Sequence, residues 1–191
     1  MNKKDELKIL HNNLIDLHEI LRKKRKTEQN RIDPFDELLF SRWEKSKYLK
    51  AKKDSSVYHN NYVSGNITIG KGTWVGPFVI LDGGGGLKIG NYCSISSGVH
   101  IYSHNTVKWA LSGGKIQRET KSVTIGNNCF IGPNVVITMG VKIGNNCVIG
   151  AQSFVNKNIP SNSIVFGTPG KIVGKVKKTN KEIILDYYEK E

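Results

Sequence analysis

The sequence has few cysteines and no long hydrophobic run. Its three cysteines, Cys93, Cys129 and Cys147, each end an N-x-C triplet. An odd number of cysteines in one repeated frame predicts small buried residues of a repeat, with a disulfide or a cysteine–metal site as the lesser alternative. No window of about 18 uncharged apolar residues is present, so we expect neither a membrane span nor a secretory signal. The expected compartment is a reducing cytoplasm.

Acidic residues are also scarce. The chain has 16 Asp and Glu against 29 Lys and Arg, which gives a formal net charge of +13 and predicts an anionic partner. Residues 54–170 contain only Asp54, Asp82 and Glu119 as acidic residues, so carboxylate chemistry has few candidates there. Nucleic acid is not the expected partner, because the sequence has neither a zinc-finger spacing nor an aromatic-rich recognition strand.

Proline is rare while glycine is abundant, with 5 and 20 residues, a combination that suits repeated tight turns. Aliphatic residues open units of six residues, a period that fits a short strand plus a turn and does not fit a helix. Because one such strand cannot bury its apolar face alone, the units must stack into a solenoid. A β-sandwich would instead show turn signals every 8 to 12 residues or so. The units begin at Ile69, Val75, Leu81, Ile89, Ile95, Ile101, Ile125, Ile131, Ile137, Ile143, Ile149 and Val155.

The units that begin at residues 125, 131 and 143 read IGNNCF, IGPNVV and IGNNCV. They resemble the repeats of the hexapeptide-repeat acyltransferases, and most closely the sugar O-acetyltransferases of the galactoside and maltose type. The resemblance covers residues 57–176 and implies an all-β solenoid, a left-handed parallel β-helix with three hexapeptides per coil. It also implies a homotrimer with an active site between neighbouring subunits. Residues 1–56 are expected to form an N-terminal helical extension and residues 177–191 a tail with a short helix.

The repeat is interrupted twice. The first interruption, residues 82–86, places four consecutive glycines after Asp82. It predicts either a simple loop or a flexible, open corner that a ligand or a neighbouring chain can approach. The second is a long loop over residues 102–122, and His104 stands near its beginning. Because insertions project from a solenoid without disturbing its interior, we expect the functional site at these interruptions.

Acyl transfer from a thioester to a hydroxyl needs a base, and an imidazole is suited to that role. In the sugar O-acetyltransferases that the chain resembles, a histidine at the start of the same loop is the catalytic base, and His104 aligns with it. The competing candidate is His100, which we expect at a solvated corner. Glu119, the acidic residue of the loop, is expected either to orient His104 or to be solvated.

The acceptor and the cofactor also have candidates. The resemblance implies that Asp82, which lies 22 residues before His104, binds the acceptor. Trp109 and Glu119 in the loop are further acceptor-binding candidates. Coenzyme A contacts are implied for residues near the C-terminal end of the repeat, where lysines suit a polyanion. These cofactor-binding candidates are Ala151, Asn156, Lys157, Thr168 and Lys171.

Two helices are predicted before the repeat. A seam of leucines at spacings of three and four predicts an amphipathic helix over residues 4–22. It would pack either on the N-terminal end of the solenoid or against its copies in an oligomer. Residues 22–26 form a basic run that is either solvated or in weak contact with a membrane surface. Asp33 and Pro34 predict the start of a second helix that continues to Leu49. The seam consists of Leu7, Leu10, Leu14, Leu17 and Leu21.

The resemblance, together with these residues, implies an acetyl-CoA-dependent O-acetyltransferase that acts on a sugar hydroxyl, in a cell-surface polysaccharide or its precursor, by direct attack with His104 as base. No metal is expected. The alternative is N-acetylation of an amino sugar or a nucleotide-linked amino sugar, which would use the same base and the same acetyl donor. A non-catalytic scaffold is the alternative from another class, and a zinc carbonic anhydrase-like site would need a third histidine besides His100 and His104. The serine acetyltransferases are similar in fold, but their His-rich and Asp-His stretch is absent.

Overall fold

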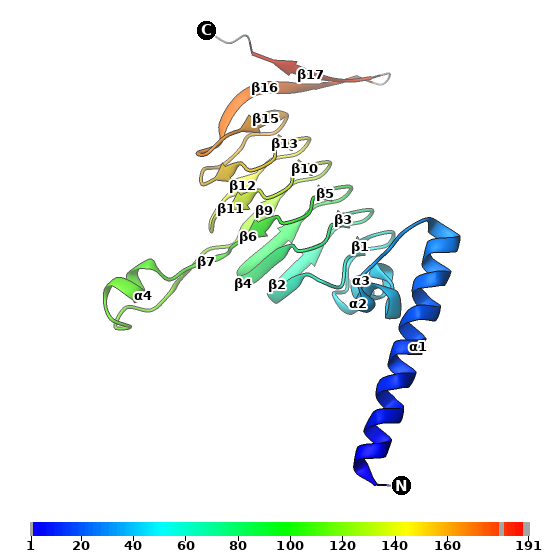
Figure 1. The fold of residues 1–191 in the computed structure, drawn as a ribbon. Helices are drawn as coiled ribbons and strands as arrows, with labels where there is room; N and C mark the ends of the chain where they lie inside the picture. The colour runs from blue at the N-terminus through cyan, green and yellow to red at the C-terminus, as the bar shows by residue number, and fades with distance from the viewer. Residues whose placement is uncertain (1, 180–181, 189–191) are drawn as a thin grey trace.

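The computed structural model describes residues 2–179 and 182–188, and its centre is a parallel β-helix with three sides (Figure 1). One side is a stack of short parallel strands. Its members are β1 (Ser56–Val57), β3 (Trp74–Val75), β5 (Ser94–Ile95), β10 (Phe130–Ile131), β13 (Val148–Ile149) and β15 (Ser163–Phe166). The strand order along this side follows the order of the coils, so each coil lies on the one before it.

The other two sides share two long strands, β2 (Tyr62–Ile69) and β4 (Ile80–Ile89), each of which runs along both sides. The second side continues from β4 through β6 (His100–Ile101), β11 (Val136–Ile137) and β14 (Phe154–Val155). The third side continues through β9 (Val123–Ile125) and β12 (Lys142–Ile143). Pairing is in register, with Leu81 beside Ile101 and Ile101 beside Ile137.

The aliphatic residues that open the units all point into the β-helix, as predicted. None of the twelve is more than 2% exposed. The neighbouring residue of the same strand points outward: Lys142 is exposed beside the buried Ile143. The interior is therefore a stack of aliphatic side chains, one from each side of each coil.

The cysteines and asparagines of the repeat also stack from coil to coil. Cys93, Cys129 and Cys147 are free and buried, as predicted. The Sγ atoms of Cys93 and Cys129 each donate to a glycine carbonyl of the next coil at 3.0 Å. The amide oxygen of Asn127 accepts the backbone N–H of Asn91 at 2.8 Å. The N-x-C triplets thus satisfy backbone groups at one corner of the β-helix.

The predicted first helix is present and longer than expected: α1 spans Lys3–Gln29. It begins after Asn2, whose side chain accepts the backbone N–H groups of Lys4 and Asp5 at 3.0 Å, and it ends at Asn30 in the left-handed conformation. These two caps define the helix at both ends. Although it is the longest helix, neither it nor any other described helix is long and apolar enough to cross a membrane.

Most of α1 projects away from the β-helix (Figure 1). Its C-terminal part contacts the following helix through Arg25, which donates to the carbonyl of Glu37 at 3.2 Å. Further toward the N-terminus, Leu7, Leu10 and Leu14 are 45–57% exposed. The leucine seam therefore does not pack on the solenoid within one chain, and its packing against other copies stays a prediction.

The prediction of one continuous second helix is wrong. The chain forms α2 (Phe35–Leu39) and α3 (Arg42–Tyr48), separated by extended backbone at Phe40 and Ser41. This break allows the Ser41 carbonyl to accept the ring N–H of His59 at 3.1 Å. It also turns α3 onto β1, so that Leu49 and Ala51 pack against the end of the core.

The prediction of a short C-terminal helix is also wrong for the residues that are described. After β15 the chain forms two antiparallel strands, β16 (Lys171–Lys178) and β17 (Ile183–Tyr187), which continue the first side of the β-helix. The open edge of β15 supplies backbone partners for a strand, and the ring of Tyr187 stacks on Phe166 with centroids 6.2 Å apart. Residues 180, 181 and 189–191 of the predicted helix lie outside the described residues.

Replacement of a stacked aliphatic residue tests this fold. Ile143→Ala should lower the free energy of unfolding by about 2–5 kcal/mol, because it removes buried methyl groups and leaves a cavity. Lys142→Ala, on the same strand but facing outward, should change it by less than about 1 kcal/mol. Urea unfolding followed by circular dichroism measures both, and equal losses would contradict the inward direction of Ile143.

Candidate active site

The loop of residues 102–122 has a regular structure and begins at the corner that follows the second side. Its two ends pair as antiparallel strands, β7 (His104–Asn105) and β8 (Glu119–Thr120), and α4 (Val107–Leu111) lies near its tip (Figure 1). At the base, the N–H of Lys121 donates to the carbonyl of Ser103 at 2.9 Å. His104 is therefore held at the rigid end of the loop, next to the β-helix.

The four-glycine segment is neither the simple loop nor the flexible, open corner that the sequence suggested. It belongs to β4 and pairs with β2, where Gly83 lies opposite Gly65. A methyl group on Gly85 would lie 2.5 Å from the carbonyl oxygen of Ser103 and 2.9 Å from the nitrogen of Lys121. The absence of a side chain therefore lets both ends of the loop lie directly against β4.

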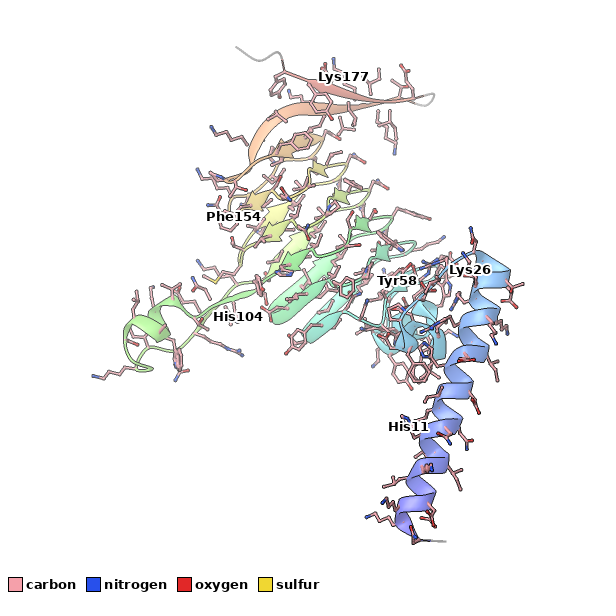
Figure 2. All side chains as sticks on the ribbon, viewed as in Figure 1. His11, Lys26, Tyr58, His104, Phe154 and Lys177 are labelled. Carbon is pink, nitrogen blue, oxygen red and sulfur yellow. The ribbon has the colours of Figure 1, made fainter. Side chains whose placement is uncertain are left out.

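Asp82 and His104 meet at this corner. The distance between His104 Nδ1 and Asp82 Oδ2 is 2.6 Å. The two residues come together because Leu81 and Ile101 stack in register, so the segments that follow them share one corner. The Asp82 side chain is 7% exposed and the His104 side chain 31% (Figure 2 labels His104). The fold thus builds a buried carboxylate with an accessible imidazole, although no contiguous Asp-His stretch exists in the sequence.

Every oxygen of the Asp82 carboxylate accepts hydrogen bonds. Oδ1 accepts the N–H of Gly84 at 2.9 Å, and Oδ2 accepts the N–H and the hydroxyl of Ser103 at 2.7 and 3.0 Å. Burial raises the pKa of Asp82, but the hydrogen bonds from Gly84, His104 and Ser103 outweigh burial and lower it to about 2. The carboxylate is therefore ionised near neutral pH and can only accept hydrogen bonds. It follows that Nδ1 of His104 carries the hydrogen, which leaves the lone pair of a neutral ring on Nε2.

Ser103 was not singled out in the sequence as a site residue. It is fully buried, and its hydroxyl donates to Asp82 while accepting the N–H of Gly85 at 2.7 Å. One side chain thus connects the carboxylate, the glycine segment and the base of the loop. The sequence feature that could have identified Ser103 as a site residue is its position immediately before His104.

A cavity of about 390 Å³ adjoins the imidazole of His104. The other residues that line it are Tyr102, Asn105, Thr106, Val107, Thr138 and Met139. His100 is not among them and does not lie at a solvated corner as expected. It is half-buried on the outer side of β6, with its ring edge-on to Tyr102 at 6.0 Å between centroids. Of the two candidate bases, His104 is the one that lines this cavity.

Glu119 does not orient His104. Its Oε1 lies 2.7 Å from Nζ of Lys108, and this contact with the ammonium group lowers the pKa of Glu119. Trp109 lies on α4 and is 50% exposed. Both residues belong to the projecting loop and neither lines the cavity beside His104, so their contact with an acceptor stays a prediction.

The cofactor-binding candidates fall into groups on two corners. Asn156 and Lys157 are exposed immediately after β14, on the same corner as the loop that carries His104. Ala151 is exposed before β14, at the opposite end of that strand. The strand β14 lies between these positions, so Ala151 and Asn156 stand at opposite ends of it.

The remaining cofactor candidates lie near Ala151. The Thr168 hydroxyl donates to the carbonyl of Gln152 at 3.0 Å, which fixes Thr168 on the Ala151 corner. Lys171 is exposed at the start of β16. One chain therefore presents its cofactor candidates on both edges of the second side. Within residues 2–179 and 182–188, no group of three or more His, Cys, Asp or Glu could hold a metal ion.

Comparison with known sequences gives a family and relatives. The family described as "Bacterial transferase hexapeptide (six repeats)" matches residues 122–157. Galactoside O-acetyltransferase of Escherichia coli (strain K12) is 31% identical over 144 residues, which are 65% of this chain and 71% of that protein. A serine acetyltransferase of Staphylococcus aureus (strain Mu50) is 34% identical over 131 residues, which are 69% of this chain but only 58% of that protein.

Solved structures agree with these relatives. A hexapeptide-repeat acetyltransferase of Vibrio cholerae O1 biovar eltor, complexed with acetyl coenzyme A, matches with a TM-score of 0.67 and 25% identity over 87% of this chain and 89% of that one. A maltose O-acetyltransferase of Clostridium difficile 630 matches with a TM-score of 0.65 and 26% identity over 86% and 89%. The predicted fold class, a left-handed parallel β-helix of hexapeptide repeats with an N-terminal helical extension, is confirmed.

The ionised state of Asp82 predicts a pH-dependent stability. Its pKa in the folded chain, about 2, lies below the ordinary value of 3.8, so its contribution is fully present above about pH 5 and is lost as the pH falls toward 2. Asp82→Asn should therefore be less stable than the native chain at pH 6, by about 2 kcal/mol, and this difference should shrink between pH 4 and pH 2. Urea unfolding at a series of pH values measures it.

Asp54→Asn is the matched control, because Asp54 is exposed. Its stability curve should stay parallel to that of the native chain over the same pH range. If the difference for Asp82→Asn were also independent of pH, the hydrogen bonds of the Asp82 carboxylate would not discriminate between its ionised and protonated forms.

Proposed function

The chain belongs to the hexapeptide-repeat acetyltransferases, and from that premise we propose that it transfers the acetyl group of acetyl-CoA to a hydroxyl of a sugar. The observation that carries this proposal is the 2.6 Å contact between Asp82 and His104 beside a cavity. The contact leaves Nε2 of the accessible imidazole as the basic atom. A base in this position suits the removal of a proton from a bound hydroxyl.

In this proposal His104 is the general base. Nε2 takes the proton of the acceptor hydroxyl while the acceptor oxygen forms a bond to the carbonyl carbon of the thioester. The carbon–sulfur bond then breaks, and the imidazolium returns the proton to the departing coenzyme A thiolate. Attack is direct in this proposal, because Ser103, the hydroxyl residue that precedes His104 in the sequence, is fully buried and its hydroxyl donates to Asp82.

Asp82 acts as a positioning residue. Its ionised carboxylate holds Nδ1–H of His104, which fixes the tautomer and the orientation of the ring and stabilises the imidazolium that forms during the reaction. The sequence suggested that Asp82 binds the acceptor. Its oxygens are occupied by Gly84, Ser103 and His104, and the side chain is buried, which favours the positioning role instead.

Acetyl-CoA would contact the exposed residues around β14. Lys157 and Lys171 supply positive charge for its phosphates, and the small side chain of Ala151 leaves room for the thin pantetheine chain. The complex of the Vibrio cholerae protein with acetyl coenzyme A supports this donor. Because the candidate contacts lie on both edges of one side, we propose a homotrimer in which neighbouring subunits contribute different edges to one coenzyme site.

A sugar acceptor is supported by the galactoside and maltose O-acetyltransferases among the relatives. The half-exposed indole of Trp109 suits packing against a sugar ring, and Glu119 can accept hydrogen bonds from sugar hydroxyls. A cell-surface polysaccharide or its precursor fits such a projecting loop. The second candidate acceptor is the hydroxyl of an amino acid, which the serine acetyltransferase relative favours. The three free cysteines fit a reducing cytoplasm as the site of the reaction.

Replacement of His104 tests the base. His104→Ala should lower kcat by about 100-fold to 10,000-fold, because proton removal in the transition state is lost. The KM for acetyl-CoA should stay nearly unchanged. The measurement is thiol release from acetyl-CoA with a panel of sugars, amino sugars and serine, so that the same assay ranks the acceptors.

Two further variants complete this test. Asp82→Asn should lower kcat less than His104→Ala does and shift the pH profile, since it removes only the orienting charge. His100→Ala, outside the cavity, should retain activity. Full activity of His104→Ala would disprove the base assignment, and absence of turnover with every acceptor would disprove the proposed acceptor classes.

Replacement of the lysines tests the coenzyme site. Lys157→Ala and Lys171→Ala should each raise the KM for acetyl-CoA several-fold with little change in kcat, and the effect should diminish at high salt because screening weakens contacts between exposed charges. Lys142→Ala, on another side of the β-helix, is the control. A KM that did not respond to either lysine would place the coenzyme elsewhere.

A further inference from the structure

A second cavity, of about 240 Å³, lies where the N-terminal helices meet the first coil. Three arginines line it: Arg25 from the end of α1, Arg31 from the segment before α2, and Arg42 from the start of α3. Tyr58 of the first coil completes the site together with the neighbouring Trp43. Figure 2 shows Tyr58 beside these helices and His104 at the base of the projecting loop, so the cavity is separate from the candidate active site.

The positive charge of this cavity is only partly neutralised. Asp33 lies 3.3 Å from Arg25 and 3.0 Å from Arg31. The other carboxylate of the cavity, Glu37, accepts the backbone N–H of His59. Arg42 has no carboxylate within salt-bridge distance among residues 2–179 and 182–188. One guanidinium group therefore remains without a counter-ion at a site that three guanidinium groups surround.

The hydroxyl of Tyr58 lies between two of these groups. Its oxygen accepts one hydrogen bond from Arg31 Nη2 and one from Arg42 Nη1, both at 2.9 Å. A hydroxyl oxygen has two lone pairs, so both are used and the group can act further only as a donor. No acceptor for its hydrogen is found in the described part of the chain.

Aromatic rings fix the orientation of Arg42. Its guanidinium carbon lies 5.3 Å from the centroid of the Trp43 ring and 5.4 Å from that of Tyr58. Such contacts hold the cation against the ring faces and leave the N–H groups at its edge available. Arg42, Arg31 and Tyr58 thus present donors from three different segments, already ordered before any ligand arrives.

We propose that this cavity binds a tetrahedral oxyanion, the phosphate group of a small phosphorylated ligand. Phosphate oxygens can accept from donors that come from several directions, whereas a planar carboxylate offers oxygens in one plane. The unneutralised charge of Arg42 and the unused hydrogen of Tyr58 are satisfied together by such a group. This site does not depend on the proposed acetyl transfer.

Titration of the full chain with inorganic phosphate tests the proposal. Isothermal calorimetry without coenzyme A should show saturable binding at one site. Tyr58→Phe keeps the ring but removes the hydroxyl, and Arg42→Gln removes the unpaired charge, so each should weaken phosphate binding by about tenfold. Lys47→Gln removes one exposed positive charge from the same helix as Arg42 and should leave the affinity unchanged.

Several results would overturn the proposal. They are absence of saturable phosphate binding, equal affinity in Tyr58→Phe and Lys47→Gln, displacement of phosphate by saturating coenzyme A, or equally tight binding of acetate. Tyr58→Phe keeps the proposal testable if Arg42→Gln fails to fold. Acetyl transfer measured on Tyr58→Phe should be normal, which separates a failure of this site from a failure of the proposed enzyme function.

Discussion

Stacking of the coils in register is the constraint on which the rest of the structure depends. A strand of two residues cannot satisfy its backbone groups or bury its side chain alone, so each coil must lie directly on its neighbour. Every position of a coil then has a fixed partner in the next coil. The stack of Leu81, Ile101 and Ile137 is one consequence, and the columns of cysteine and asparagine are another.

The same constraint assembles the candidate active site. Segments that follow stacked residues share one corner, and Asp82 thereby meets the base of the loop that follows Ile101. Gly85 allows the loop ends to contact β4 without a side chain between them. The buried Ser103 then connects this contact to the carboxylate. Interruptions of a repeat can carry such chemistry because they leave the aliphatic interior intact.

The N-terminal extension adds a second kind of surface to the β-helix. Residues 1–53 contain 15 of the 29 basic residues, a surplus for which the sequence offers no role. Three of these residues gather around Tyr58, where the helices cover the first coil. Hydrogen-bond donors from these arginines line one small cavity there. This cavity is separate from the His104 imidazole and from the lysines near β14.

The sequence by itself determined the elements that depend on local pattern. The six-residue period predicted which side chains enter the core, the leucine spacing predicted α1, and the interruption of the repeat indicated His104. The sequence did not reveal that Asp82 contacts His104 or that the Ser103 hydroxyl donates to Asp82. It also did not reveal that two arginines donate to the hydroxyl of Tyr58. The sequence also led to three wrong expectations: His100 at a solvated corner, one continuous helix across Ser41, and a helix where β17 forms. Those features depend on which residues face one another across coils and between helices, and contacts between residues tens of positions apart are formed only when the chain has folded.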